Sequence, residues 1–225
     1  MVWQNNIPAF VTALILGGTE WLAVARGWRR LEYVFKPATL VAVILAAWLL
    51  ARRPHDAWMA HFFLPGLIFS LAGDILLLLP GDRFFVLGLA SFLLAHICYI
   101  VGLNPTLPPR PALVLSVIVG VIGLPLLRRI LLELRRRGQA AMTMPVGLYG
   151  LVLSVMLFSA WATLFRPDWA PLRRALVTAG ASLFFASDVT LAWNRFVVPL
   201  SSGRLWVMVT YHLGQMALAA SIALW

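Results

Sequence analysis

The chain has 225 residues, of which 62% are hydrophobic and only 12% are charged, and its mean hydropathy is +0.90. Since soluble domains carry about 25% charged residues, this composition excludes a water-soluble globular protein and predicts an integral membrane protein. The net charge of +10 comes mostly from loop arginines beside anionic lipid head groups, so it calls for no nucleic-acid partner. The single cysteine, Cys98, excludes an intrachain disulfide and a cysteine-based metal site.

Eight apolar segments approach or reach the length that a helix needs to cross a bilayer, about 17–25 residues. The connections between them are too short for a soluble domain, so residues 1–225 are predicted to form one all-α bundle of eight transmembrane helices. The first segment lacks a basic start and a clear cleavage site, and we interpret it as a retained helix. The segments are 6–25, 36–51, 58–79, 84–103, 111–132, 144–165, 171–193 and 204–224.

Lysine and arginine are divided unequally between the two ends of this bundle. Twelve of the 18 lie in or beside the connections that follow the first, third, fifth and seventh segments, here called the odd-numbered connections. Because cytoplasmic loops are enriched in these residues, the odd-numbered connections are predicted to be cytoplasmic and both chain ends to lie outside. The preference for arginine over lysine suggests a bacterial source, and therefore the inner membrane.

Two of the segments carry an aspartate in a similar context. LIFSLAGDILLL (67–78) aligns with ASLFFASDVTLA (181–192), which places Asp74 over Asp188 at an offset of 114 residues. Half the chain corresponds to four helices, and an even number keeps both units in the same orientation. The alignment predicts two parallel repeats, residues 1–108 and 109–225; the alternative is a chance alignment of apolar segments.

The two aspartates are expected at the same depth. An ionisable residue in an apolar segment usually faces a protein interior or a wet cavity, because its exposure to lipid is costly. Asp74 and Asp188 each lie five residues before the predicted end of their segment, about 7–8 Å inside the boundary on the side of the odd-numbered connections. The sequence predicts one polar cavity on that side, with both aspartates catalytic. The predicted substrate-binding residues are Lys36, His96, Tyr149, His212, Glu20 and Asn194.

Each of these residues also has a purely structural interpretation. The aspartates and histidines could hydrogen-bond neighbouring helices, and Lys36 could be an anchor that reaches to the membrane surface. Two carboxylates at equal depth favour a functional site. Lys36 is the only lysine and is followed by Pro37, which favours a position that needs a compact ammonium group.

Several reaction classes lack their usual motifs. The sequence has no Gly-x-Ser-x-Gly, no His-Glu-x-x-His, no phosphate-binding glycine loop and no Cys-His metal spacing. No metal or cofactor is therefore expected. What remains is acid–base chemistry by two carboxylates, one protonated in an apolar pocket and the other ionised in a more polar one.

Short motifs follow one another in a fixed order along about residues 20–225. They are Phe35-Lys36-Pro37, Gly73-Asp74 with its leucine run, Phe92-x-x-Ala95-His96-x-x-Tyr99, Tyr149, Gly180-Ala181-x-Leu183-Phe184-x-x-Ser187-Asp188 and Tyr211-His212-x-x-Gln215. This order resembles the YhhN-like lysoplasmalogenase family. No single motif is specific; the likeness rests on their order and on the eight-helix plan.

The resemblance implies a membrane hydrolase that cleaves the vinyl ether bond of a lysoplasmalogen or a related lysolipid. Its products would be a fatty aldehyde and glycerophosphoethanolamine or glycerophosphocholine. This chemistry needs a proton donor, a base for water and negative charge near the cationic intermediate. Asp74 and Asp188 suit these roles in either order, and Lys36 could hold the substrate phosphate. The alternatives are a proton-coupled transporter and a non-catalytic lipid-binding membrane protein.

Overall fold

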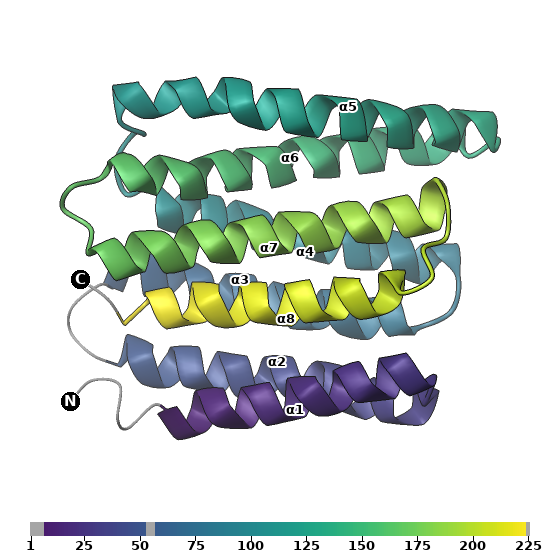
Figure 1. Ribbon diagram of the computed structural model, residues 1–225, viewed down its shortest axis with the longest axis horizontal. Coiled ribbons are helices and arrows are strands. Elements are labelled where there is room, and N and C mark those ends of the chain that lie inside the picture. The colour runs from purple at the N-terminus through teal and green to yellow at the C-terminus, as the bar shows by residue number, and fades with distance from the viewer. Residues whose placement is uncertain (1–6, 53–56, 224–225) are drawn as a thin grey trace.

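The computed structural model describes residues 7–52 and 57–223. Over these residues the chain is helical, with α-helices joined by short turns and three short 3₁₀ segments, η1 (Arg110–Leu113), η2 (Ala140–Met142) and η3 (Thr163–Phe165). The helices lie side by side in one antiparallel bundle (Figure 1). They are α1 (Ile7–Arg26), α2 (Arg29–Ala51), α3 (Ala57–Leu78), α4 (Asp82–Leu103), α5 (Val114–Arg136), α6 (Thr143–Ala162), α7 (Pro171–Phe196) and α8 (Gly203–Ser221).

The predicted class, an all-α membrane protein, is confirmed. In the described part of the chain, seven helices are long and apolar enough to cross a membrane, namely α1 to α7. The eighth, α8, has 19 residues and runs alongside them (Figure 1). Its mean hydropathy is lowered by polar residues such as Tyr211, His212 and Gln215, all of which face the interior. The outer ends of predicted segments one and eight, residues 6 and 224, lie outside the described residues, as does Arg53.

The predicted start of the second helix is wrong. α2 begins at Arg29 and not at residue 36, so only Gly27 and Trp28 separate it from α1. Gly27 makes the turn with a φ of +70°, a conformation that glycine adopts without steric cost. A search for apolar residues misses the charged first turns of α2, although arginine and glutamate favour helices. Lys36 therefore lies seven residues into α2, about 10 Å from its start.

The two aspartates are also not equally far from the ends of their helices. Asp74 lies four residues before the end of α3, as the sequence roughly predicts, whereas α7 continues to Phe196, eight residues beyond Asp188. The hairpins α3–α4 and α7–α8 meet in the middle of the bundle through aromatic side chains, with Phe92 of α4 against Phe184 of α7 and Tyr211 of α8; Figure 1 shows how these helices lie. The distances to the helix ends alone do not place the two carboxylates at one depth. The packing of the helices against one another brings them together.

Glycines allow the central helices to approach closely. A Cβ atom added to Gly180 would lie 3.0 Å from the Gly214 carbonyl oxygen, so α7 and α8 touch through their backbones. A Cβ atom on Gly73, beside Asp74, would lie 2.6 Å from the Phe92 ring. Small residues of this kind let membrane helices pack without a gap. Polar residues of α3, α4, α7 and α8 are buried in the interior between these helices.

Candidate active site

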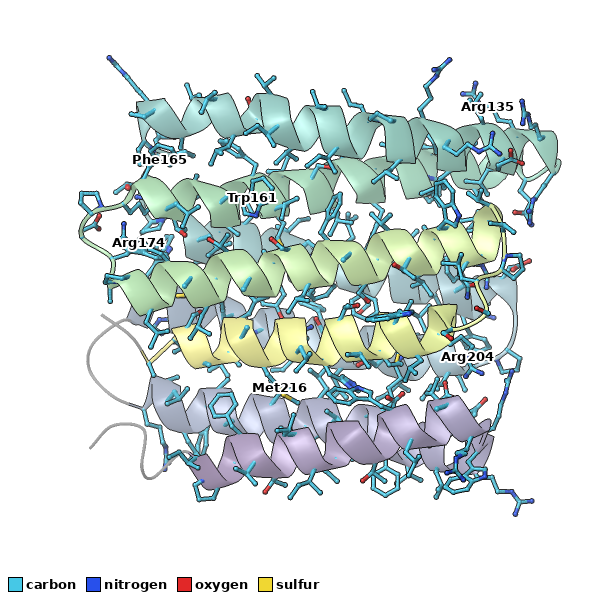
Figure 2. All side chains as sticks on the ribbon, viewed as in Figure 1. Arg135, Trp161, Phe165, Arg174, Arg204 and Met216 are labelled. Carbon is cyan, nitrogen blue, oxygen red and sulfur yellow. The ribbon has the colours of Figure 1, made fainter. Side chains whose placement is uncertain are left out.

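A cavity of about 400 Å³ lies at the end of the bundle that carries the odd-numbered connections, here called the odd end. Arg29, Arg195 and Arg204 lie around its mouth, near the ends of α2, α7 and α8; Figure 2 shows Arg204 at this end. Deeper in the cavity are the side chains of Asp74 and Asp188. The structure thus brings the two aspartates together in one polar cavity that opens at the odd end, as the sequence predicts.

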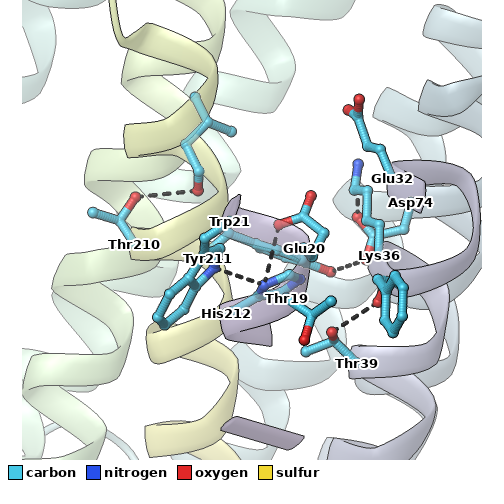
Figure 3. A network of polar contacts seen from close by, with 12 residues as sticks. Thr19, Glu20, Trp21, Glu32, Lys36, Thr39, Asp74, Thr210, Tyr211 and His212 are labelled. Atoms are coloured by element: carbon cyan, nitrogen blue, oxygen red, sulfur yellow. Dashed lines mark hydrogen bonds and ion pairs between the residues drawn. The ribbon is translucent and has the colours of Figure 1, made fainter. Parts of the chain in front are cut away.

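Asp74 is held as one half of a buried ion pair. Its Oδ1 lies 3.2 Å from Nζ of Lys36, which comes from α2. Its Oδ2 accepts a hydrogen bond of 2.8 Å from the hydroxyl of Tyr211, which comes from α8. The Asp74 residue is 1% exposed and Lys36 is 4% exposed, and Figure 3 shows the pair between α2 and α3. Opposite charge in contact is what a buried carboxylate needs to remain ionised.

Asp188 has different partners. Its Oδ2 accepts a hydrogen bond of 2.5 Å from the hydroxyl of Tyr149 on α6. The same oxygen lies 3.1 Å from Nε2 of His96 on α4, and that nitrogen also lies 3.0 Å from the Tyr149 hydroxyl. Within the described residues, Asp188 has no ion pair with lysine or arginine, and its Oδ1 makes no hydrogen bond. One oxygen of the Asp188 carboxylate is therefore free of hydrogen bonds, and no lysine or arginine of the described chain pairs with this carboxylate.

Glu20 and His212 lie beside this site and do not line the cavity. Both are fully buried, and the Nε1–H group of Trp21 donates a hydrogen bond of 3.1 Å to Nδ1 of His212. The nearest Glu20 oxygen is 3.9 Å from the same His212 nitrogen. Neither Glu20 oxygen has a hydrogen-bond partner in the described structure. Figure 3 shows this group between α1 and α8. Their predicted contact with substrate stays a prediction.

Asn194, the remaining predicted binding residue, lines the cavity. Its side-chain oxygen accepts a hydrogen bond of 2.7 Å from the backbone N–H of Leu200. The Asn194 side chain thus fixes the turn between α7 and α8.

Sequence reasoning missed an ion pair at the cavity mouth. Arg204 of α8 donates to both carboxylate oxygens of Glu32 on α2, each at 2.6 Å. The Arg204 side chain is 47% exposed and that of Glu32 is 11% exposed. Both residues line the cavity together with Arg29. Glu32 lay in a stretch predicted to be a loop and Arg204 was the first residue of the predicted eighth segment, so nothing in the sequence paired them. Tyr211 was recognised as part of a motif, but no feature of the sequence identified it as a partner of Asp74.

Comparison with known proteins identifies similar chains. Residues 31–222 match the YhhN family. The lysoplasmalogenase TMEM86B of Homo sapiens is 32% identical over 182 residues, which cover 81% of this chain and 72% of the relative. The Mus musculus protein of the same name is 29% identical over 216 residues, 96% of this chain and 85% of the relative. A lysoplasmalogenase of Mycobacterium bovis is 32% identical over 180 residues, 76% of this chain and 62% of the relative. No solved structure shows significant similarity.

Proposed function

The chain belongs to the YhhN family, and from this premise we propose that it is a lysoplasmalogenase. The reaction is hydrolysis of the vinyl ether bond of a lysoplasmalogen to a fatty aldehyde and glycerophosphoethanolamine or glycerophosphocholine. The observation that carries the proposal is the pair of aspartates in one cavity with contrasting partners. Such a contrast between two carboxylates is how other enzymes separate an acid from a base.

We assign the acid to Asp188. A vinyl ether is activated when a proton is added to its β-carbon, and the donor must present a protonated oxygen to the substrate. Asp188 has a free Oδ1 in the cavity and no cationic lysine or arginine to hold it ionised within the described residues. The hydroxyl of Tyr149 and the ring of His96 fix the other oxygen. They are positioning residues in this mechanism.

Asp74 acts as the general base, and its carboxylate supplies the negative charge of the site. Its ion pair with Lys36 keeps it ionised, so it can stabilise the oxocarbenium ion formed by protonation and take a proton from the attacking water. The resulting hemiacetal then loses the glycerol oxygen, which takes the proton from Asp74. The hemiacetal hydroxyl gives its proton to Asp188 as the aldehyde forms. Both aspartates return to their starting states, and one water is consumed.

The head group belongs at the mouth of the cavity in this proposal. Lys36, predicted from sequence to hold the phosphate, is 4% exposed and contacts Asp74. Arg29 and Arg204 offer guanidinium groups nearer the surface, which bind phosphate well. The negative charge of the Glu32 carboxylate can attract the positively charged nitrogen of an ethanolamine or choline head group. The mouth lies at the odd end, which holds most of the lysine and arginine, and we infer that it faces the cytoplasm of a bacterial inner membrane.

The test is aldehyde release from a defined lysoplasmalogen by the purified protein in detergent or nanodiscs. We expect the wild type to release aldehyde and the double variant Asp74→Asn/Asp188→Asn to release none above the blank. Asp168→Asn is the matched control, because Asp168 is exposed at the opposite end of the bundle. Binding of the lipid without cleavage would support a non-catalytic lipid-binding protein instead. Substrate-dependent proton flux into liposomes would support a transporter.

A further inference from the structure

A second, apolar space lies between α4, α5, α6 and α7. Its volume is about 60 Å³, and nearly all the residues around it are apolar. It meets the polar cavity at Asp188, which lines both spaces. The other residues shared by the two spaces are Leu77, Phe85, Phe92 and Leu191. We call the apolar space the α5–α6 groove. A ligand that is polar at one end and apolar at the other could occupy both spaces with Asp188 at the junction.

The α5–α6 groove runs from the odd end toward the middle of the bundle. Ile130 and Val146 line it near the odd end, six residues before the end of α5 and three after the start of α6. Gly123 and Ser154 line it further in, 13 residues from that end of α5 and 11 from that start of α6. The inner part lies about 16–20 Å along the helices. This is the orientation of a lipid in a leaflet, with its head group at the surface and its chain toward the midplane.

Glycines bring α5 and α6 close together along this space. A Cβ atom on Gly150 would lie 2.8 Å from Cδ1 of Leu127, and one on Gly123 would lie 3.2 Å from Oγ of Ser154. The outer wall is α5, the least buried of the candidate membrane spans, which lies at one edge of the bundle in Figure 1. A volume of 60 Å³ equals about two waters, so side chains such as Leu127 must move to admit a hydrocarbon chain.

We propose that the α5–α6 groove binds the alkenyl chain of the substrate, and that its inner end at Gly123 sets the chain length accepted. This inference rests on the proposed function and specifies where the hydrocarbon chain of its substrate lies. The groove shares Asp188 with the polar cavity, so a chain in the groove and a head group at the mouth place the vinyl ether beside that residue. A lipid with two chains would leave one of them without a groove.

The experiment is a chain-length series of lysoplasmalogens with the same head group. In Gly123→Leu the new side chain fills the inner end of the groove. We expect kcat/KM for the longest chains to fall about tenfold relative to that for the shortest, since each buried methylene is worth about 0.8 kcal/mol, or fourfold. Gly120→Leu is the matched control on the same helix, where a Cβ atom meets only Leu124, at 3.9 Å. The control should keep the wild-type ratio. Equal loss at all lengths, or no change in the ratio, would overturn the proposal.

A labelling experiment separates this proposal from the proposed function. A single-chain lysolipid with a photoreactive diazirine near the end of its chain is bound to the wild type and irradiated. Labelled peptides should come from α5 and α6 around Gly123 and Ser154, and labelling should decrease in Gly123→Leu but not in Gly120→Leu. If the wild type cleaves no lysoplasmalogen but this labelling occurs, the hydrolase assignment fails and the groove stands. Labelling spread over the outer surface would overturn the groove itself.

Discussion

Asp74 and Asp188 are contacted by helices in corresponding positions, but the charges of the contacting groups differ. Each aspartate is contacted by the helix before its own, through Lys36 of α2 or Tyr149 of α6. Each is also contacted by the last helix of the other half, through Tyr211 of α8 or His96 of α4.

The spacing of these partners follows the spacing of the aspartates. Lys36 and Tyr149 are 113 residues apart and His96 and Tyr211 are 115 apart, compared with 114 for the two aspartates. The predicted parallel repeat remains a proposal, and this exchange of contacts supports it.

The difference between the two sites lies in the partners. In the first half the partner from the preceding helix is an ammonium group, and in the second half the corresponding partner is a neutral phenol. In the proposed mechanism, the same backbone arrangement holds Asp74 ionised beside Lys36 and lets Asp188 carry the proton. A repeated fold can supply an acid and a base from one kind of residue when a single partner is changed.

The largest expected effect comes from exchanging each aspartate for asparagine. We expect Asp188→Asn to lower kcat by about 10²–10⁴, the usual contribution of a general acid, with little loss of stability because Asp188 has no ion pair with lysine or arginine in the described chain. Asp74→Asn should lose comparable activity and also unfold more easily, because Lys36 is left buried without its counter-charge. Aldehyde release and thermal unfolding measure the two effects. Equal loss of stability in both variants would contradict the charge assignment.

The ion pair itself is tested by a double-mutant cycle on Lys36 and Asp74. Lys36→Met leaves a buried carboxylate alone and should cost about 3–5 kcal/mol of folding free energy. Lys36→Met/Asp74→Asn removes both charges and should recover part of that stability while remaining inactive. If Lys36 instead binds the substrate phosphate, Lys36→Met will raise KM and leave the unfolding transition unchanged. Denaturant unfolding and steady-state kinetics distinguish these outcomes.

The two tyrosines provide a smaller and closely matched comparison. Tyr149→Phe and Tyr211→Phe each remove one hydroxyl that donates to an aspartate. When the Tyr211 hydroxyl is removed, Asp74 still pairs with Lys36. When the Tyr149 hydroxyl is removed, Asp188 keeps only its contact with the ring of His96. We expect kcat to fall by roughly threefold to tenfold more in Tyr149→Phe than in Tyr211→Phe, the equivalent of one hydrogen bond. The reverse order would place the acid at Asp74.

The smallest effect is expected at Glu20. Glu20→Gln replaces a buried carboxylate that lacks hydrogen-bond partners in the described structure with a neutral amide, which is easier to bury. Because Glu20 does not line the cavity, kcat/KM should stay within about twofold of the wild type. A tenfold loss in folded protein would bring Glu20 into the reaction, as the sequence analysis expected.

Much of the fold could be predicted from the sequence, because apolar segments in lipid have to be helices. The start of α2 could not, since its first turns are charged. Asp74 and Asp188 could be predicted as a pair because a carboxylate in an apolar segment is rare. Two carboxylates that fall on the same position of two aligned apolar segments are rarer still. Their partners depend on how each helix is rotated about its axis. That is why Tyr211 and the Glu32–Arg204 pair were missed and why Lys36 was placed too near the surface.

The most direct test of the central claim is hydrolysis in D₂O with analysis of the product aldehyde. If Asp188 protonates the β-carbon, the wild type will release aldehyde that carries one deuterium on the carbon next to the carbonyl. The rate in D₂O will be lower than in H₂O, and Asp188→Asn will form no labelled aldehyde above the blank. Product aldehyde incubated alone in D₂O corrects for exchange. Enzymatic aldehyde without that deuterium, or Asp188→Asn forming labelled aldehyde at the wild-type rate, would contradict the account.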